Sequence, residues 1–180
     1  MNRDIRVAGW AGIAAFATGA LVVFLTGTPT QPYPDWSWTD QQIAHHFAVQ
    51  RTNVAAQFYL ANFGFALVVW FAAGLKHLLH TATGPSVHLS LIIPCAAVQA
   101  VTLQQTNGMW WVAALRPTVD AHNARLAYEI CIAVGYTAIH FFMSFMIFAT
   151  ATQLRRGTVF PRFWATTSYV AAAIVMCGTF

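Results

Sequence analysis

Charged residues are scarce in this sequence. Asp, Glu, Lys and Arg make up 8% of the 180 residues, and 58% of the residues are hydrophobic, whereas a soluble domain carries about 25% charged residues. So few charges cannot cover a surface that is exposed to water. The composition therefore excludes an ordinary soluble domain and predicts that much of the surface faces lipid.

Cysteines and the motifs of cofactor chemistry are scarce as well. The three cysteines, Cys95, Cys131 and Cys177, all lie in apolar segments, where an odd number predicts small buried side chains and no disulfide framework. The sequence has no CxxC, HExxH, GxSxG, GxGxxG or phosphate-binding loop, and no basic run with interleaved aromatic residues. We therefore expect no metal site, no cofactor, no nucleotide and no nucleic acid.

Five apolar segments are long enough, or nearly so, to cross the hydrocarbon core, which takes about 20 residues. They cover residues 7–25, 54–75, 87–107, 126–150 and 163–180. Backbone groups in lipid must find hydrogen-bond partners within their own segment, so each segment is expected to be a helix. The sequence thus predicts one all-α domain over residues 1–180, an integral membrane bundle of five transmembrane helices.

The first segment is expected to stay in the protein and to pack closely against another helix. It is longer than the apolar region of a signal peptide, and no small-residue cleavage site follows it. Four small residues on one face would let a neighbouring helix approach closely in lipid. These residues are Ala8, Gly12, Ala15 and Gly19.

Positive charges predict the orientation, because Lys and Arg are more frequent in cytoplasmic loops. With the N-terminus inside, the inner loops hold six such residues: Arg3, Arg6, Lys76, Arg155, Arg156 and Arg162. The outer loops hold three: Arg51, Arg116 and Arg125. We therefore expect a cytoplasmic N-terminus.

A short helix is expected in the first outer loop. Thr39 and Gln42 have the spacing of a capping box, and Ile43 and Phe47 fall on one helical face. We expect this helix to lie at the outer membrane surface or to run into the second span.

The fourth apolar segment carries a polar seam, formed by Glu129, Tyr136, His140 and Ser144. Their spacings of 7, 4 and 4 residues place all four within an arc of about 80° on a regular helix. Polar groups that face lipid are costly, so the polar seam is expected to face the interior of the bundle.

Three interpretations of the polar seam stay open. It can form interhelical hydrogen bonds, or it can line a cavity for an amphipathic molecule. The candidate ligand-binding residues are Tyr136, His140, Ser144, Gln99, Thr102 and Asn62. The third interpretation is catalysis by His140 and Glu129, but eleven residues of helix separate them by about 16 Å, so we assign no catalytic residue. Haem ligation by His140 or His46 is a further alternative without an attachment motif.

Two loops resemble those of a known family. Leu115-Arg116-Pro117 after the third span and Val159-Phe160-Pro161-Arg162-Phe163-Trp164 before the fifth are similar to the FRP-type and VFPRW-type motifs of uncharacterised bacterial multi-pass membrane proteins, mainly from actinobacteria. The resemblance implies the bacterial inner (plasma) membrane and a sixth span after residue 180. It implies no activity, and so no site residue.

The small chain has no energy-coupling motif and no chain of ionisable residues across the membrane. We therefore expect a non-enzymatic role, either as an accessory subunit of a larger membrane protein complex or as a binder of a lipid or sterol-like ligand. Membrane lipids are the other expected partners. The alternative is a membrane-embedded enzyme, such as an isomerase, that acts on an apolar substrate.

Overall fold

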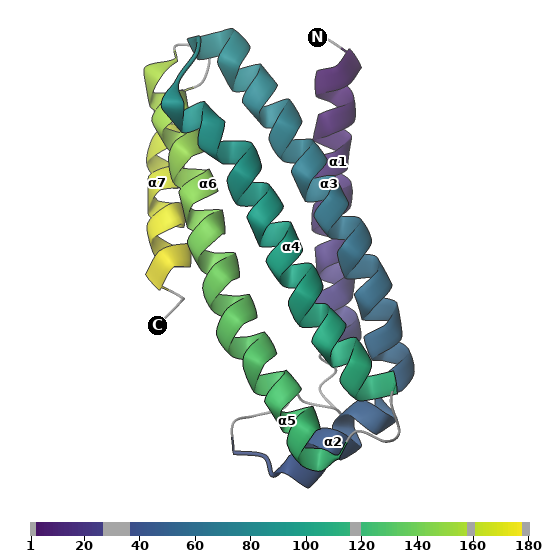
Figure 1. Ribbon diagram of the computed structural model, residues 1–180. Coiled ribbons are helices and arrows are strands. Elements are labelled where there is room, and N and C mark those ends of the chain that lie inside the picture. Colours follow the sequence, from purple (N-terminus) through teal and green to yellow (C-terminus); the bar gives the residue numbers. More distant parts are fainter. Residues whose placement is uncertain (1–2, 27–36, 116–119, 158–160, 178–180) are drawn as a thin grey trace.

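The computed structural model describes residues 3–26, 37–115, 120–157 and 161–177 (Figure 1). Within these ranges the chain is helical and no strand is present, which confirms the all-α prediction. The elements are α1 (Arg3–Thr26), α2 (Asp40–Val49), α3 (Arg51–Thr83), α4 (Val87–Leu115), α5 (Ala121–Ile130), the π-helix η1 (Cys131–Tyr136), α6 (Thr137–Arg156) and α7 (Arg162–Cys177).

Four stretches of helix are long and apolar enough to cross a membrane. Among the described residues, they are Arg3–Val22, Arg51–Thr83, Val87–Leu115 and the continuous run Ala121–Arg156. They overlap the first predicted span, 7–25, and contain the next three. Helix α7 covers most of the fifth predicted segment but has 16 residues and is not among the four. The fifth span therefore stays a prediction, whereas a helical membrane protein with four candidate spans is what the fold shows.

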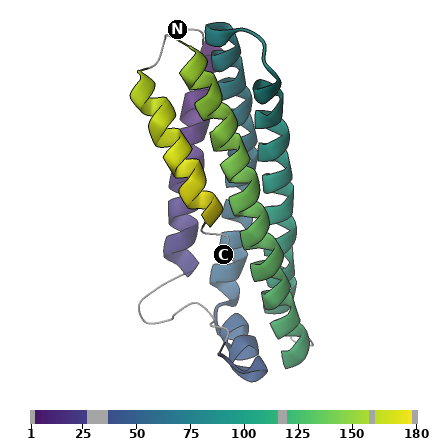
Figure 2. The ribbon, with the colours of Figure 1, turned by 90° about the vertical axis from the view of Figure 1, so that its left-hand side faces the viewer.

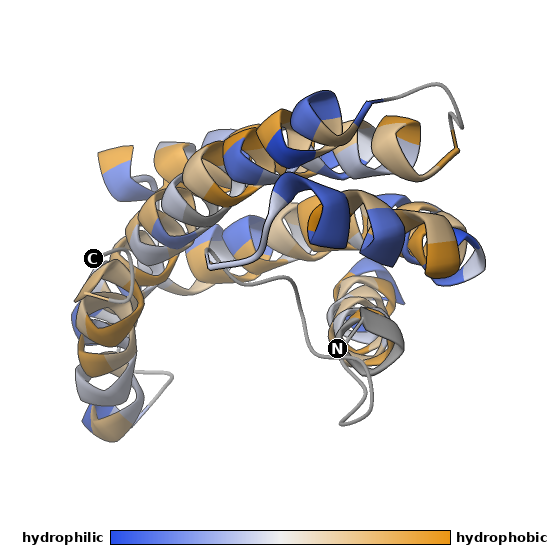
Figure 3. Cartoon of the chain, turned by 90° about the horizontal axis from the view of Figure 1, so that it is seen from below, coloured by the Kyte–Doolittle hydropathy of each residue, from blue (hydrophilic) through white to orange (hydrophobic). Residues whose placement is uncertain are grey.

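The long helices pack as an open, curved row. Helix α1 packs on α3, α3 on α4, α4 on α6, and α6 on α7, and the described parts of α1 and α7 make no contact with each other. Figures 1 and 2 show the short helix α2 at the end opposite the N-terminus, and Figure 3 shows hydrophilic residues in the short helices at that end. Among the described residues, one apolar cluster lies where α2 and α5 meet α3 and α4, and a second lies near the turn between α3 and α4.

Small side chains bring α1 and α3 together, as the first segment predicted. Ala8 and Ala11 are buried on this face, and Gly12 lies against the ring of Phe71. A Cβ atom on Gly74 of α3 would collide with Ala8. The predicted packing face is thus used at Ala8 and Gly12, while Gly19 is exposed.

Helix α2 begins with the predicted capping box. The backbone N–H of Thr39 donates to Oε1 of Gln42 at 2.7 Å, and the backbone N–H of Gln42 donates to Oγ1 of Thr39 at 3.3 Å. Ile43 and Phe47 are buried, as their common face predicted. The ring of Phe47 lies edge-on to Trp110 of α4 at 5.7 Å between centroids, so α2 caps the core between α4 and α5.

A glutamine that sequence reasoning did not single out ties the other end together. Gln153 of α6 is fully buried; its Nε2 donates to Oγ of Ser86 at 2.7 Å, and its Oε1 accepts from Oγ1 of Thr83 at 3.0 Å. Nη1 of Arg156 also donates to Oγ of Ser86, at 3.2 Å. These bonds hold α6 against the turn between α3 and α4, where Gly84 has a φ of 78° that favours glycine.

Replacing Gly74 with Ala is expected to destabilise the α1–α3 contact. The added methyl group collides with Ala8, and overpacking of this kind costs about 1–3 kcal/mol. The matched control is Gly9→Ala, because a Cβ on Gly9 meets nothing within 4 Å, and Ala is the better helix former. Thermal unfolding in detergent should show a lower midpoint for Gly74→Ala than for Gly9→Ala; equal midpoints would contradict the close approach.

Candidate functional site

The structure buries the inner part of the polar seam. Ser144 is 2% exposed, and its hydroxyl donates to the backbone carbonyl of His140 at 2.7 Å. His140 itself is half-buried. The side chain of Tyr136 lies outside the described residues. The polar group of Ser144 is thus satisfied within its own helix.

Two of the other predicted ligand-binding residues lie across from this part of α6. A Cβ on Gly135 would lie 3.2 Å from Oγ1 of Thr106, and Ala96 and Ala149 belong to one buried cluster. Gly135 and Thr106 are therefore at one level of the antiparallel helices, and Ala96 and Ala149 are at another. Between these two levels, equal numbers of residues along α4 and α6 place Gln99 opposite Ser144 and Thr102 near the level of His140. The structure therefore brings these four predicted residues to one interface, between α4 and α6.

Gln99 and Asn62 each keep a carbonyl oxygen without a hydrogen-bond partner. Gln99 is 5% exposed, and neither its Oε1 nor Oδ1 of Asn62 is hydrogen-bonded to a described residue. Asn62 lies on α3, which packs on α4. The rings of Phe58 and Trp111 stack at 5.2 Å, which places these two residues at the same level of the antiparallel helices α3 and α4. Asn62 follows Phe58 by four residues, so it lies near the level of Gly108 and Thr106, which precede Trp111. It is therefore separate from the cluster around Gln99.

Glu129 does not continue the polar seam. The π-helix η1 lies between Glu129 and His140, and its wider turns change the angular step that a regular helix would have. Oε1 of Glu129 accepts from Nε of Arg125 at 2.7 Å. The carboxylate is thus held within α5 by Arg125 of the same helix, and the structure does not bring it to His140.

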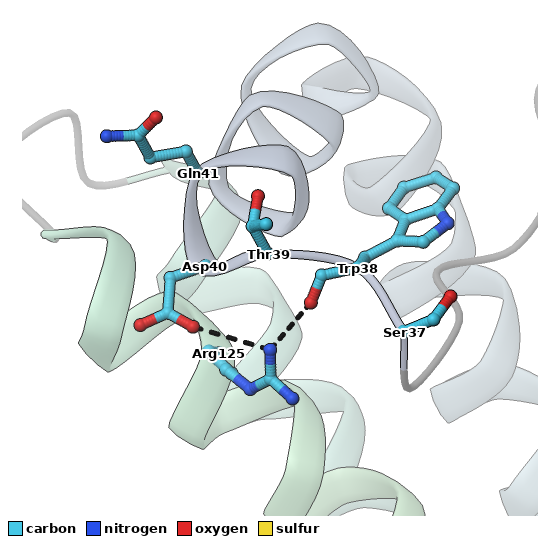
Figure 4. A pocket seen from close by; sticks show the side chains of 6 residues that line it. All are labelled: Ser37, Trp38, Thr39, Asp40, Gln41 and Arg125. Carbon is cyan, nitrogen blue, oxygen red and sulfur yellow. Dashed lines mark hydrogen bonds and ion pairs between the residues drawn. The ribbon is translucent and has the colours of Figure 1, made fainter.

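An arginine that sequence reasoning left without a site role joins α2 to α5. Nη1 of Arg125 donates to the backbone carbonyl of Trp38 at 2.6 Å and to Oδ1 of Asp40 at 3.4 Å (Figure 4). Residues 37–41 and Arg125 line an open pocket of about 710 Å³. The spacing of Arg125 and Glu129 by four residues was a readable signal for their ion pair, but the contact with Asp40 depends on the fold.

The second pocket is an apolar groove between α4 and α5, with a volume of about 380 Å³. We call it the α4–α5 groove, and it is lined by Gln105, Gly108, Met109, Val112, Ala113, Asn123 and Ala127. Sequence reasoning did not find this groove, because its walls come from two helices and most of its residues are ordinary for a membrane span. Gln105 and Asn123 supply side-chain amides near its two ends.

No group of three or more His, Cys, Asp or Glu side chains that could hold a metal ion occurs among the described residues. Comparison of the chain with known protein families, with characterised proteins and with solved structures finds no match.

The charge state of His46 is expected to make the packing of α2 sensitive to acid. Burial lowers the pKa of His46 below 6.5, and the nearby His45 lowers that pKa further. The folded protein therefore favours neutral His46, so stability is unaffected well above pH 6.5 and falls as the pH drops below that value, where the unfolded chain binds the proton more readily.

Thermal unfolding in detergent at a series of pH values will test this expectation. The slope due to one histidine is at most about 1.4 kcal/mol per pH unit. His46→Phe keeps an aromatic ring beside Trp38. In this variant the free energy of unfolding should fall less steeply as the pH drops below 6.5, the acid limb of the stability profile. His80→Gln, an exposed change at the opposite end, should leave it unchanged. Identical acid limbs for the wild type and His46→Phe would contradict the assignment.

Proposed function

We propose that the protein resides in a bacterial inner membrane with five spans, its N-terminus in the cytoplasm and α2 in the outer headgroup layer. Six Lys and Arg residues support this orientation by lying at the end with the N-terminus (Figure 1): Arg3, Arg6, Lys76, Arg155, Arg156 and Arg162. The described residues of the opposite end combine Arg51 and Arg125 with three carboxylates, Asp40, Asp120 and Glu129. Membership of the bacterial family that the loops resemble is part of the same proposal.

Single cysteines in a chain without its native cysteines will test this orientation. The exposed positions Gln41 and Thr81 lie at opposite ends. A membrane-impermeant thiol reagent should label Gln41→Cys in intact spheroplasts and Thr81→Cys only after permeabilisation. The reverse pattern would overturn the proposed orientation.

The function that the geometry supports best is binding of a lipid or sterol-like molecule in the α4–α5 groove. The groove is the main observation that supports this proposal. It is concave, mainly apolar and has a few polar groups, which is typical of a binding site for an apolar ligand. Exposed side chains such as Met109 and Val112 open it to the side, where lipid chains would enter. The protein would act without catalysis, as a ligand-binding or accessory component of a membrane assembly.

The polar seam supports a different role. Ser144 and Gln99 are buried between two packed helices, and Ser144 bonds within its own helix. This favours interhelical contacts over a ligand cavity at that place. The enzyme alternative has no comparable support, since Glu129 is paired with Arg125 and lies about 16 Å along the helix from His140.

Filling the groove is expected to weaken ligand binding. A Cβ on Gly108 makes only an ordinary contact with the ring of Phe58, at 4.0 Å, so the backbone has room for the first carbon of the new side chain in Gly108→Leu. The matched control is Gly9→Leu, the same change at an open position of α1. Capture of a photoreactive fatty acid or sterol by the purified protein in nanodiscs should fall about tenfold in Gly108→Leu, which corresponds to about 1.4 kcal/mol.

Gly9→Leu should capture the probe as the wild type does. Peptide mapping of the captured probe should locate it on α4 and α5. Equal capture by Gly108→Leu and Gly9→Leu, with equal unfolding midpoints, would overturn the proposed site.

A further inference from the structure

Gln105 is a polar side chain in a place where lipid would surround it. It lies four residues from residue 101, the middle of α4, which is about 6 Å along a helix that must cross a core of about 30 Å. Its side chain is exposed and lines the α4–α5 groove. The amide therefore lies within the hydrocarbon region of the membrane and faces outward.

The Gln105 amide needs a partner from outside the helices that surround it. Its side chain forms no hydrogen bond with another described residue, and an amide in an apolar medium is costly unless such a bond is made. Polar groups at this depth generally mark a functional site. A plain hydrocarbon chain in the groove would fill the space but leave the amide unsatisfied.

The side-chain amides of Gln105 and Asn123 lie far apart along the groove. Trp110 and Tyr128 stack at 6.2 Å between centroids and set the register of α4 against α5. Gln105 lies five residues inward of Trp110 and Asn123 five residues outward of Tyr128, so the two amides are separated by about 15 Å along the groove. Asn123 lies near Asp120, which caps α5, at the polar end of the helix.

The size of the groove favours a single chain as its occupant. A helix about 10 Å wide and 15 Å long takes up roughly 1,200 Å³, whereas the groove holds about 380 Å³. A transmembrane helix of a partner could therefore cover the groove but could not enter it and reach along its length.

We propose that the α4–α5 groove selects lipid-type chains that carry a hydroxyl or carbonyl oxygen part-way along, and that this oxygen pairs with the Gln105 amide. The polar head of the ligand lies near Asn123, and the mid-chain oxygen lies about 15 Å deeper. This inference rests on the proposed ligand-binding function and adds the chemical class of the ligand. Gln105 is the specificity-determining residue.

Competition between two fatty acids will test the selection. The full chain in phosphatidylcholine nanodiscs is labelled with a photoreactive stearate, which is then displaced by stearate or by a mid-chain hydroxystearate. The wild type should prefer the hydroxystearate about tenfold, because only this ligand satisfies the amide. Gln105→Leu should bind stearate as well as the wild type does and should lose the preference.

Gln104→Leu is the matched control, because Gln104 is also exposed in α4 but does not line the groove; it should keep the preference. A series of hydroxystearates should show the strongest preference when the hydroxyl lies about 15 Å from the carboxylate.

The outcomes separate the two proposals. Absence of any capture of either the photoreactive fatty acid or the photoreactive sterol would overturn the ligand-binding function, and the selection with it. Capture that Gly108→Leu reduces, but that shows no preference for the hydroxyl, would overturn the selection alone. Loss of the preference in Gln104→Leu as well, or dissociation of an oligomer by Gln105→Leu, would also overturn the selection. In either case the effect would not come from a hydrogen bond between the Gln105 amide and a ligand in this groove.

Discussion

An unpaired polar group in an apolar medium costs free energy, and this cost shapes most of the molecule. Hydrocarbon offers no hydrogen bonds, so a helix can expose polar side chains only where its neighbours, its own backbone or a ligand satisfy them. Ser144 uses the carbonyl of His140, and Gln153 is satisfied on both sides by the turn between α3 and α4. The outward-facing Gln105 is subject to the same constraint, because its side chain forms no hydrogen bond with another described residue.

Polar contacts hold the ends of the helices together, and small residues bring two of the helices close. At one end Arg125 joins α5 to the start of α2, and at the other Gln153 joins α6 to Ser86. The α1–α3 contact depends on Gly74 and Ala8, where the backbones approach closely. This division follows from the surroundings, because water and headgroups at the ends tolerate charged side chains, whereas dispersion contacts between small residues are what bring helices together in lipid.

The π-helix divides one apolar segment into two parts with different roles. Outward of η1, α5 carries Arg125 and Glu129 and presents Asn123 to the groove; inward of it, α6 packs its polar positions against α4. Gly135 within η1 lies directly against Thr106 of α4. Widened helical turns of this kind are frequent at functional sites because they reorient the side chains that follow. Here the change separates the helix that lines the α4–α5 groove from the helix that packs against α4.

The sequence by itself determined the all-helical class, the four candidate spans, the capping box at Thr39 and the buried face of Ile43 and Phe47. All of these depend on composition and on spacing along one helix. Only the tertiary structure decided that Glu129 leaves the polar seam, that Arg125 also reaches Asp40, that Gln153 joins α6 to the turn between α3 and α4, and that Gln105 and Asn123 share a groove. The departure of Glu129 from the polar seam was missed because the prediction assumed a regular helix with about 100° per residue, and the apolar residues of η1 do not reveal a π-helix. The others depend on the register between helices, which lipid-facing sequences specify weakly, since a buried apolar residue and a lipid-facing one look alike.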